Sequence, residues 1–185
     1  MNHIDLSSVL RQTVSCELYS NLVTRPTGAA VRHQIERLLD DAHDRTLTVI
    51  DFSQVSMIDF SCADEVIAKL LMRHEAADSP RDAYFLFRGV TDEHWEAIEA
   101  VLERRGLALV LEQADGVHVV CALSSEERRA WEAVRELGQG KPADLAEHLD
   151  VSETEAQRAL EALRRRRLVM RAGDDYVVVG AHRVG

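Results

Sequence analysis

The sequence has few cysteines and no long hydrophobic run, and both absences narrow the classes of protein to which it can belong. Its 185 residues include three cysteines, Cys16, Cys62 and Cys121. An odd number of widely separated cysteines argues against a disulfide framework and against a C-x-x-C metal site. No apolar stretch approaches the roughly 18 residues of a membrane-spanning helix, so we expect no membrane association. The first residues, MNHIDLSSVLRQT, place polar side chains where a secretory signal has its apolar region, which predicts a cytoplasmic protein.

Motifs for catalysis, phosphate binding and metal binding are also missing. The eight histidines are scattered without H-x-x-x-H or Cys/His spacing, so we expect no metal ion. The segment LGQGKP lacks the full G-x-x-x-x-G-K-[ST] pattern, and neither G-x-S-x-G nor G-x-G-x-x-G occurs. Asp51 and Asp59 lack the positioned partners that acid/base catalysis needs, which favours turn capping or contact with a partner. We therefore expect no enzyme, no catalytic residue and no cofactor.

Charge is distributed unevenly along the chain. The net charge is −10, from 22 basic and 32 acidic residues. Residues 1–123 carry −9 of this charge, and residues 124–185 carry only −1. The overall acidity therefore excludes little about DNA binding by the second part. The uneven distribution predicts an acidic, protein-binding part joined to a near-neutral module, which binds DNA weakly or with the help of another component.

Residues 1–122 alternate between strand and helix patterns. Residues 46–52 and 83–87 are apolar on both faces and predict buried strands, residues 17–23 are a further strand candidate, and ALVLE and GVHVVCAL are expected to form a hairpin. Apolar residues at helical spacing predict helices over 28–43, 62–71 and 92–105. Ser61 is the expected N-cap of the second helix, and Asp64 completes an S-x-x-D start that resembles a capping box. This alternation implies an α/β domain with a largely parallel sheet.

The pattern changes after Ala122. Helices are expected over 124–137, 142–150 and 151–167, and the strands LVMR and YVVVG flank the turn AGDD as a hairpin. Helix, short helix, longer helix and hairpin is the order of a winged helix-turn-helix, a small α+β domain. We therefore expect two domains, 1–122 and 123–185.

The segment VIDFSQVSMIDFSCADEVIAKLL resembles the STAS domain of bacterial anti-sigma factor antagonists. In that family, a D-S-S-G-like motif supplies a serine that a partner kinase phosphorylates. Asp59 matches the motif aspartate and Ser61 the serine, whereas Phe60 replaces the first serine and Cys62 replaces the glycine. The segments VTRPTGAAVRHQIERLL and FSCADEV are similar to those of a STAS-like branch found in small prokaryotic proteins. The resemblance covers roughly residues 17–122, and it implies a STAS-like mixed sheet with helices and a serine kinase or sigma-factor regulator as partner.

Two interpretations of Ser61 are open from the sequence. Backbone N–H groups and the helix dipole favour a phosphate at a helix N-terminus, but neighbouring carboxylates would repel it. Alternatively, Ser61 is only a cap, which contributes about 1 kcal/mol to its helix. The expected phospho-acceptor or partner-binding residues are Ser61, Asp59, Asp64 and Glu65.

Residues 124–179 are similar to winged-helix transcriptional regulators, and ADLAEHLDVSETEAQRALEAL is similar to their helix-turn-helix core. The resemblance implies that the longer helix contacts duplex DNA, with a homodimer on paired half-sites as a plausible arrangement. The expected DNA-binding residues are Ser152, Thr154, Gln157, Arg158, Arg164, Arg165, Arg166, Arg167 and Arg171.

The charges on this helix also support another use. Glu153 and Glu155 lie at its N-terminus, where they would repel a duplex, and Glu161 is placed to pair with Arg165. The arginine run then serves as a solvated helix end that complements the helix dipole. We therefore expect a non-enzymatic transcriptional or signalling regulator. A partner-switching adaptor that binds proteins with both domains and no DNA is the alternative.

Overall fold

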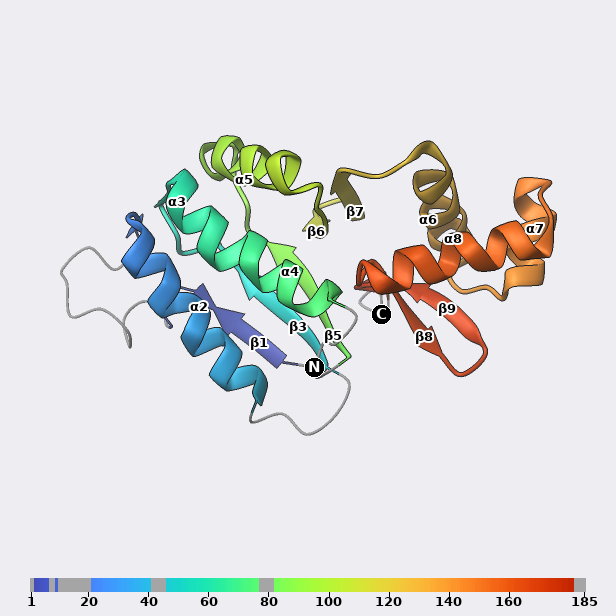
Figure 1. The fold of residues 1–185 in the computed structure, drawn as a ribbon, viewed down its shortest axis with the longest axis horizontal. Helices are drawn as coiled ribbons and strands as arrows, with labels where there is room; N and C mark the ends of the chain where they lie inside the picture. The colour runs from blue at the N-terminus through green and yellow to red at the C-terminus, as the bar shows by residue number, and fades with distance from the viewer. Residues whose placement is uncertain (1, 7–8, 10–20, 41–45, 77–81, 182–185) are drawn as a thin grey trace.

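The computed structural model describes residues 2–6, 9, 21–40, 46–76 and 82–181, and its largest sheet has five strands (Figure 1). The strand order is β1 (Asn2–Asp5), β3 (Thr46–Asp51), β5 (Ala83–Arg88), β6 (Ala108–Gln113) and β7 (Gly116–Cys121). The first four strands run parallel, and β7 pairs antiparallel with β6. The expectation of a mixed α/β protein with a largely parallel sheet and a late hairpin is confirmed.

One face of this sheet is covered by the helices between its strands (Figure 1). A continuous helical run, 60–75, packs between α2 (Arg25–Asp40) and α5 (Asp92–Arg105). The run consists of α3 (Phe60–Ala63), a π-helical turn η1 (Asp64–Ala68) and α4 (Lys69–Glu75). Apolar residues of these helices meet Ile50, Phe87 and Leu111 of the strands in one core.

The other face of the sheet packs against the C-terminal part of the chain. Val49, Leu86 and Val110 occupy one register row of β3, β5 and β6, and they share a second core with Trp131. Gly180 lies so close to this face that a Cβ added there would be 3.0 Å from both methyl carbons of Leu86. The two parts of the chain therefore share a core, and a division into domains at residue 122 stays a prediction.

The C-terminal part consists of α6 (Ser125–Leu137), α7 (Pro142–Leu149), α8 (Glu153–Arg165) and a hairpin of β8 (Val169–Ala172) and β9 (Asp175–Val178). Ser124 caps α6 and Ser152 caps α8, each in a capping box completed by a glutamate three residues later. These reciprocal hydrogen bonds satisfy backbone N–H groups that have no partner within the helix, which explains where both helices begin. The expected order of three helices and a hairpin is present.

Several local predictions differ from the structure, among them the following three. The sequence pattern does not predict β1, a short strand at the sheet edge. The candidate strand 17–23 is described only as β2 (Asn21–Leu22), which pairs with β4 (Met57–Ile58), and residues 17–20 lie outside the described part. The helix expected over 28–43 begins at Arg25, since proline at position 26 is compatible with a first helical turn. Positions 41–43 are outside the described residues.

None of the helices in the described part of the chain has the length and apolarity needed to cross a bilayer. Within the same residues, no cluster of three or more His, Cys, Asp or Glu side chains is arranged to hold a metal ion.

Candidate functional site

The turn before the helical run 60–75 is organised by Asp59. Its Oδ1 accepts hydrogen bonds from the N–H of Cys62 at 2.7 Å and from the hydroxyl of Ser61 at 2.9 Å. Its Oδ2 accepts from the N–H of Thr24 at 3.0 Å. Burial raises the pKa of Asp59, but these hydrogen bonds outweigh it and lower the pKa below its ordinary value. Asp59 therefore stays ionised at neutral pH and fixes the start of the helix against the turn before α2.

The prediction that Ser61 is the N-cap is wrong, because Asp59 occupies that position. Ser61 is the second residue of α3, and its hydroxyl donates to the cap instead of acting as one. A carboxylate is the stronger acceptor, and it reaches the amide of Cys62 from one turn before. Ser61 is partly exposed.

Asp64 does not complete a capping box, and both Asp64 and Glu65 are buried. Asp64 pairs with Arg25 at 3.0 Å and with Arg105 at 2.9 Å, and Glu65 pairs with Arg25 at 2.7 Å and with Lys69. Burial raises the pKa of both carboxyls, but their cationic partners outweigh it and lower both values. These two residues therefore connect the helical run to α2 and α5. As placed here, they offer no free carboxylate to a partner.

The helical run also approaches α2 closely. A Cβ added at Gly28 would lie 2.9 Å from the Cα of Cys62 and 3.0 Å from the Cβ of Glu65. The Cys62 thiol donates to the carbonyl oxygen of Thr24 at 2.9 Å, and burial raises its pKa to about 12. Because the thiol stays protonated, Cys62 is a packing residue and not a nucleophile here.

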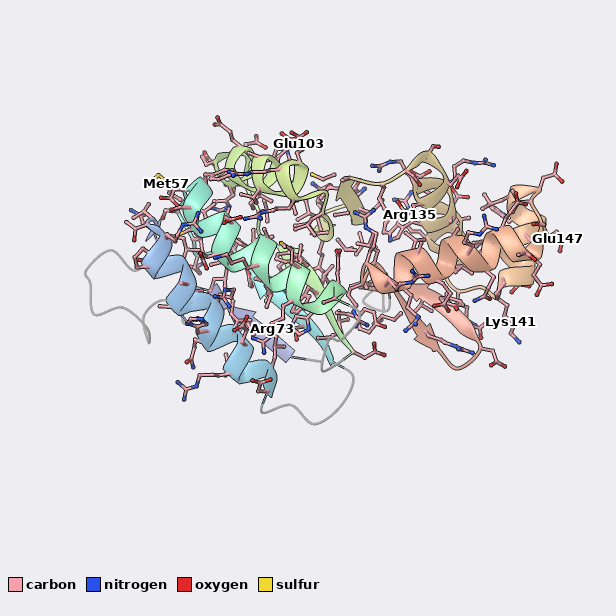
Figure 2. All side chains as sticks on the ribbon, viewed as in Figure 1. Met57, Arg73, Glu103, Arg135, Lys141 and Glu147 are labelled. Carbon is pink, nitrogen blue, oxygen red and sulfur yellow. The ribbon has the colours of Figure 1, made fainter. Side chains whose placement is uncertain are left out.

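Apolar side chains are exposed next to Ser61. The exposed fraction is 46% for Met57, labelled in Figure 2, and 36% for Phe60. The guanidinium of Arg104 lies 5.7 Å from the centre of the Phe60 ring, within the range of a cation–π interaction. Large exposed apolar side chains beside a basic group are a common feature of protein-binding surfaces.

The predicted DNA-binding residues at the start of α8 have different surroundings. Ser152 accepts from the N–H of Glu155 and donates its hydroxyl to that side chain, so its oxygen is engaged in the cap. Gln157 is exposed, and its amide donates to the hydroxyl of Tyr176 at 3.3 Å. Thr154 and Arg158 are exposed.

At the end of α8 the predicted pairing of Glu161 with Arg165 is wrong. Glu161 pairs with Arg164 at 3.0 Å and accepts from the hydroxyl of Tyr176 at 2.6 Å. Arg165 is exposed, and so is Arg171, whose guanidinium donates to the carbonyl oxygen of Gly173 in the hairpin turn.

Arg166 and Arg167, which we call the arginine junction, contact the first part of the chain. Arg166 pairs with Glu127 at 3.1 Å and donates to the carbonyl oxygen of Gly106 at 3.1 Å. Arg167 donates to the carbonyl oxygen of His74 at 2.8 Å and pairs with Asp82. Only 18% of the Arg166 side chain and 11% of the Arg167 side chain are exposed. The structure therefore uses these two arginines to join the parts of the chain.

Asp51 is engaged in a structural network at the end of β3. It accepts from the N–H and hydroxyl of Ser53 at 2.9 and 2.6 Å, and its other oxygen accepts from Arg88. Burial raises the pKa of Asp51, but these contacts outweigh it and bring the value down to about 2. Such a carboxylate is ionised at neutral pH and is a poor general base.

The arginines that surround the site are the residues that sequence reasoning misses. Arg25 and Arg105 lie 39 and 41 positions from Asp64, and no local pattern marks them as its partners.

Comparison of the chain with protein-family models and with curated proteins gives no match.

Proposed function

We propose that this protein is a non-enzymatic regulator in which a STAS-like unit, residues 1–122, receives a signal at Ser61. A winged-helix unit, residues 123–185, then binds duplex DNA, as a homodimer on paired half-sites. The signal is the binding of a partner protein or phosphorylation of Ser61 by a partner serine kinase. The proposal places this regulator in the cytoplasm.

The position of Ser61 is the observation that carries this proposal. Ser61 is partly exposed in the first turn of a helix, where backbone N–H groups and the helix dipole favour an added phosphate. Met57 and Phe60 are exposed beside it. At the other end of the same helical run, the carbonyl oxygen of His74 binds Arg167, which follows α8. A change at Ser61 therefore has a short route, along one helix, to the unit that we propose contacts DNA.

Four exposed residues support DNA contact by the second unit: Thr154, Arg158, Arg165 and Arg171. Arginine can contact phosphates or base edges, and threonine can donate to either. Because residues 124–185 carry a net charge of −1, the expected affinity is weak.

DNA binding is tested by titrating a labelled duplex of mixed sequence with the full chain at several salt concentrations. We expect the logarithm of the association constant to fall linearly with the logarithm of the salt concentration, because bound arginines release counterions. Arg158→Gln should weaken binding and reduce this slope by about one. Arg37→Gln removes the same charge from an exposed position on α2 and should change neither quantity. A slope of zero, or no binding at low salt, would overturn the DNA-binding part.

The signal at Ser61 is tested separately with extract of the host cells and labelled ATP. We expect phosphate to be incorporated into the wild-type chain and not into Ser61→Ala. If both chains bind the partner equally before and after treatment with ATP, phosphorylation of Ser61 is not the signal.

The arginine junction favours a second candidate, an adaptor that binds proteins with both units and no DNA. Arg166 and Arg167 have partners within the chain, and Glu153 and Glu155 are exposed at the start of α8. A protein complex that survives nuclease treatment, together with a salt slope of zero, would support the adaptor.

A further inference from the structure

A carboxyl group lies at the point where the helical run 60–75 meets the C-terminal part of the chain. Glu75 is the last residue of α4, directly after His74. The Oε1 atom of Glu75 is shielded from solvent and has no hydrogen-bond partner among the described residues. A buried carboxylate oxygen without a partner is costly, so this group is stable in the protonated form.

The groups that surround Glu75 come from several elements. The charges of Glu127 on α6 and of the arginine junction after α8 all affect the pKa of the Glu75 carboxyl. His74 precedes it on the same helix, and Asp82 pairs with Arg167 ahead of β5. Burial raises the pKa of Glu75 to about 7, opposed by Arg166 and Arg167 and reinforced by Glu127. A small change of pH near neutrality therefore changes the charge of this carboxyl.

Ionisation of Glu75 would place two carboxylates in competition for one guanidinium. In the structure Arg166 is bound to Glu127 at 3.1 Å and to the carbonyl oxygen of Gly106. An ionised Oε1 would have to acquire an arginine or a water molecule, and acquiring Arg166 requires the arginine junction to rearrange.

We propose that Glu75 is a proton-operated switch that sets how the arginine junction holds the end of α8 against the sheet. The protonated carboxyl leaves Arg166 on Glu127 and Arg167 on His74. The ionised carboxyl draws Arg166 from Glu127 and loosens the junction. This inference concerns the chain alone, so it stands or falls independently of any partner or DNA.

His74 is not the titrating group in this range. Burial lowers the pKa of its imidazole to about 4, with further contributions from Arg73 and Arg167. It is therefore neutral wherever Glu75 changes charge.

Trp131 is a natural reporter of the switch. Its indole N–H donates to the carbonyl oxygen of Leu168 at 3.3 Å, and Leu168 follows the arginine junction. The indole is buried, so a change in this hydrogen bond is not masked by solvent contact.

The experiment is an NMR titration of the full chain from about pH 5.5 to about pH 8.5, following the Glu75 carboxyl carbon and the Trp131 indole N–H. We expect both signals to titrate together near neutrality. Glu75→Gln should keep the indole in its low-pH position throughout, whereas Glu147→Gln, exposed on α7, should titrate like the wild-type chain.

Two outcomes would overturn the proposal. One is a Glu75 carboxyl that titrates in the ordinary acidic range of glutamate in the wild-type chain, which requires no variant to fold. The other is an indole transition that persists in Glu75→Gln, since another group would then cause it.

Discussion

The Nε atom of Arg167 donates a 2.8 Å hydrogen bond to the carbonyl oxygen of His74, which lies 93 residues earlier in the chain. The guanidinium also lies 5.5 Å from the centre of the Tyr84 ring, and the backbone of Arg167 has a left-handed φ of +60°. This conformation is uncommon for a residue with a side chain, and the surrounding contacts hold it in place. The helical run that begins beside Ser61 is thereby fixed at its other end to the segment after α8.

Replacing Arg167 with alanine should destabilise the whole chain. The variant loses a hydrogen bond from a charged donor and leaves Asp82 without this partner, for a cost of about 2 kcal/mol. Urea titration measures the free energy of unfolding. Arg165→Ala removes an exposed arginine two positions away and should leave the unfolding curve unchanged. Equal curves for the wild type and Arg167→Ala would show that the contact contributes nothing to stability.

Asp59 and Ser61 should differ in their effect on stability. Asp59→Ala removes the N-cap of the helical run and its bond to Thr24, and it should cost about 1–2 kcal/mol. Ser61→Ala removes only a donor to that cap, so it should cost less than about half of this. Thermal unfolding of the two variants compares them directly. A larger loss of stability for Ser61→Ala than for Asp59→Ala would indicate that Ser61, and not Asp59, caps the helical run.

The elements that depend on local sequence are predicted well. The helix expected over 92–105 is α5 with the same bounds, and the helix expected over 124–137 is α6, which begins one residue later. The periodicity of apolar residues and the hydrogen bonds of a cap span only a few positions.

The site is predicted less well because its contacts span long distances in sequence. Asp64 and Glu65 look like surface carboxylates at a helix start until Arg25 and Arg105 are brought beside them by the fold. The arginine run likewise has the pattern of a solvated helix end, and only the fold brings His74 and Asp82 beside Arg167. The S-x-x-D pattern favours Ser61 as the cap, but Asp59 lies two positions earlier and its carboxylate is the stronger acceptor for the N–H of Cys62.

Gly28 should be intolerant of any side chain. Gly28→Ala raises the helix propensity of α2, yet its Cβ would meet the backbone of Cys62 at 2.9 Å, where little can move. We expect a net destabilisation of about 1–3 kcal/mol, as for other overpacked positions. Gly140→Ala is the control, since its nearest neighbour would be the tip of Leu137 at 3.4 Å. Urea unfolding of both variants gives the comparison, and a Gly28→Ala chain as stable as the wild type would mean that α2 can move away from the helical run.

Asp51 should make stability depend on pH at the acidic end. Its folded pKa is lowered from 3.8 to about 2, so its contribution is fully present above pH 3.8 and is lost as the pH falls through 2. The wild-type chain should therefore lose about 2 kcal/mol over this interval relative to Asp51→Asn, whose side chain does not titrate. Urea unfolding of both chains at pH values across this interval gives the difference. Glu147→Gln, which alters an exposed carboxyl, is the control, and a difference between wild type and Asp51→Asn that stays constant with pH would show that Ser53 and Arg88 do not stabilise the ionised carboxylate.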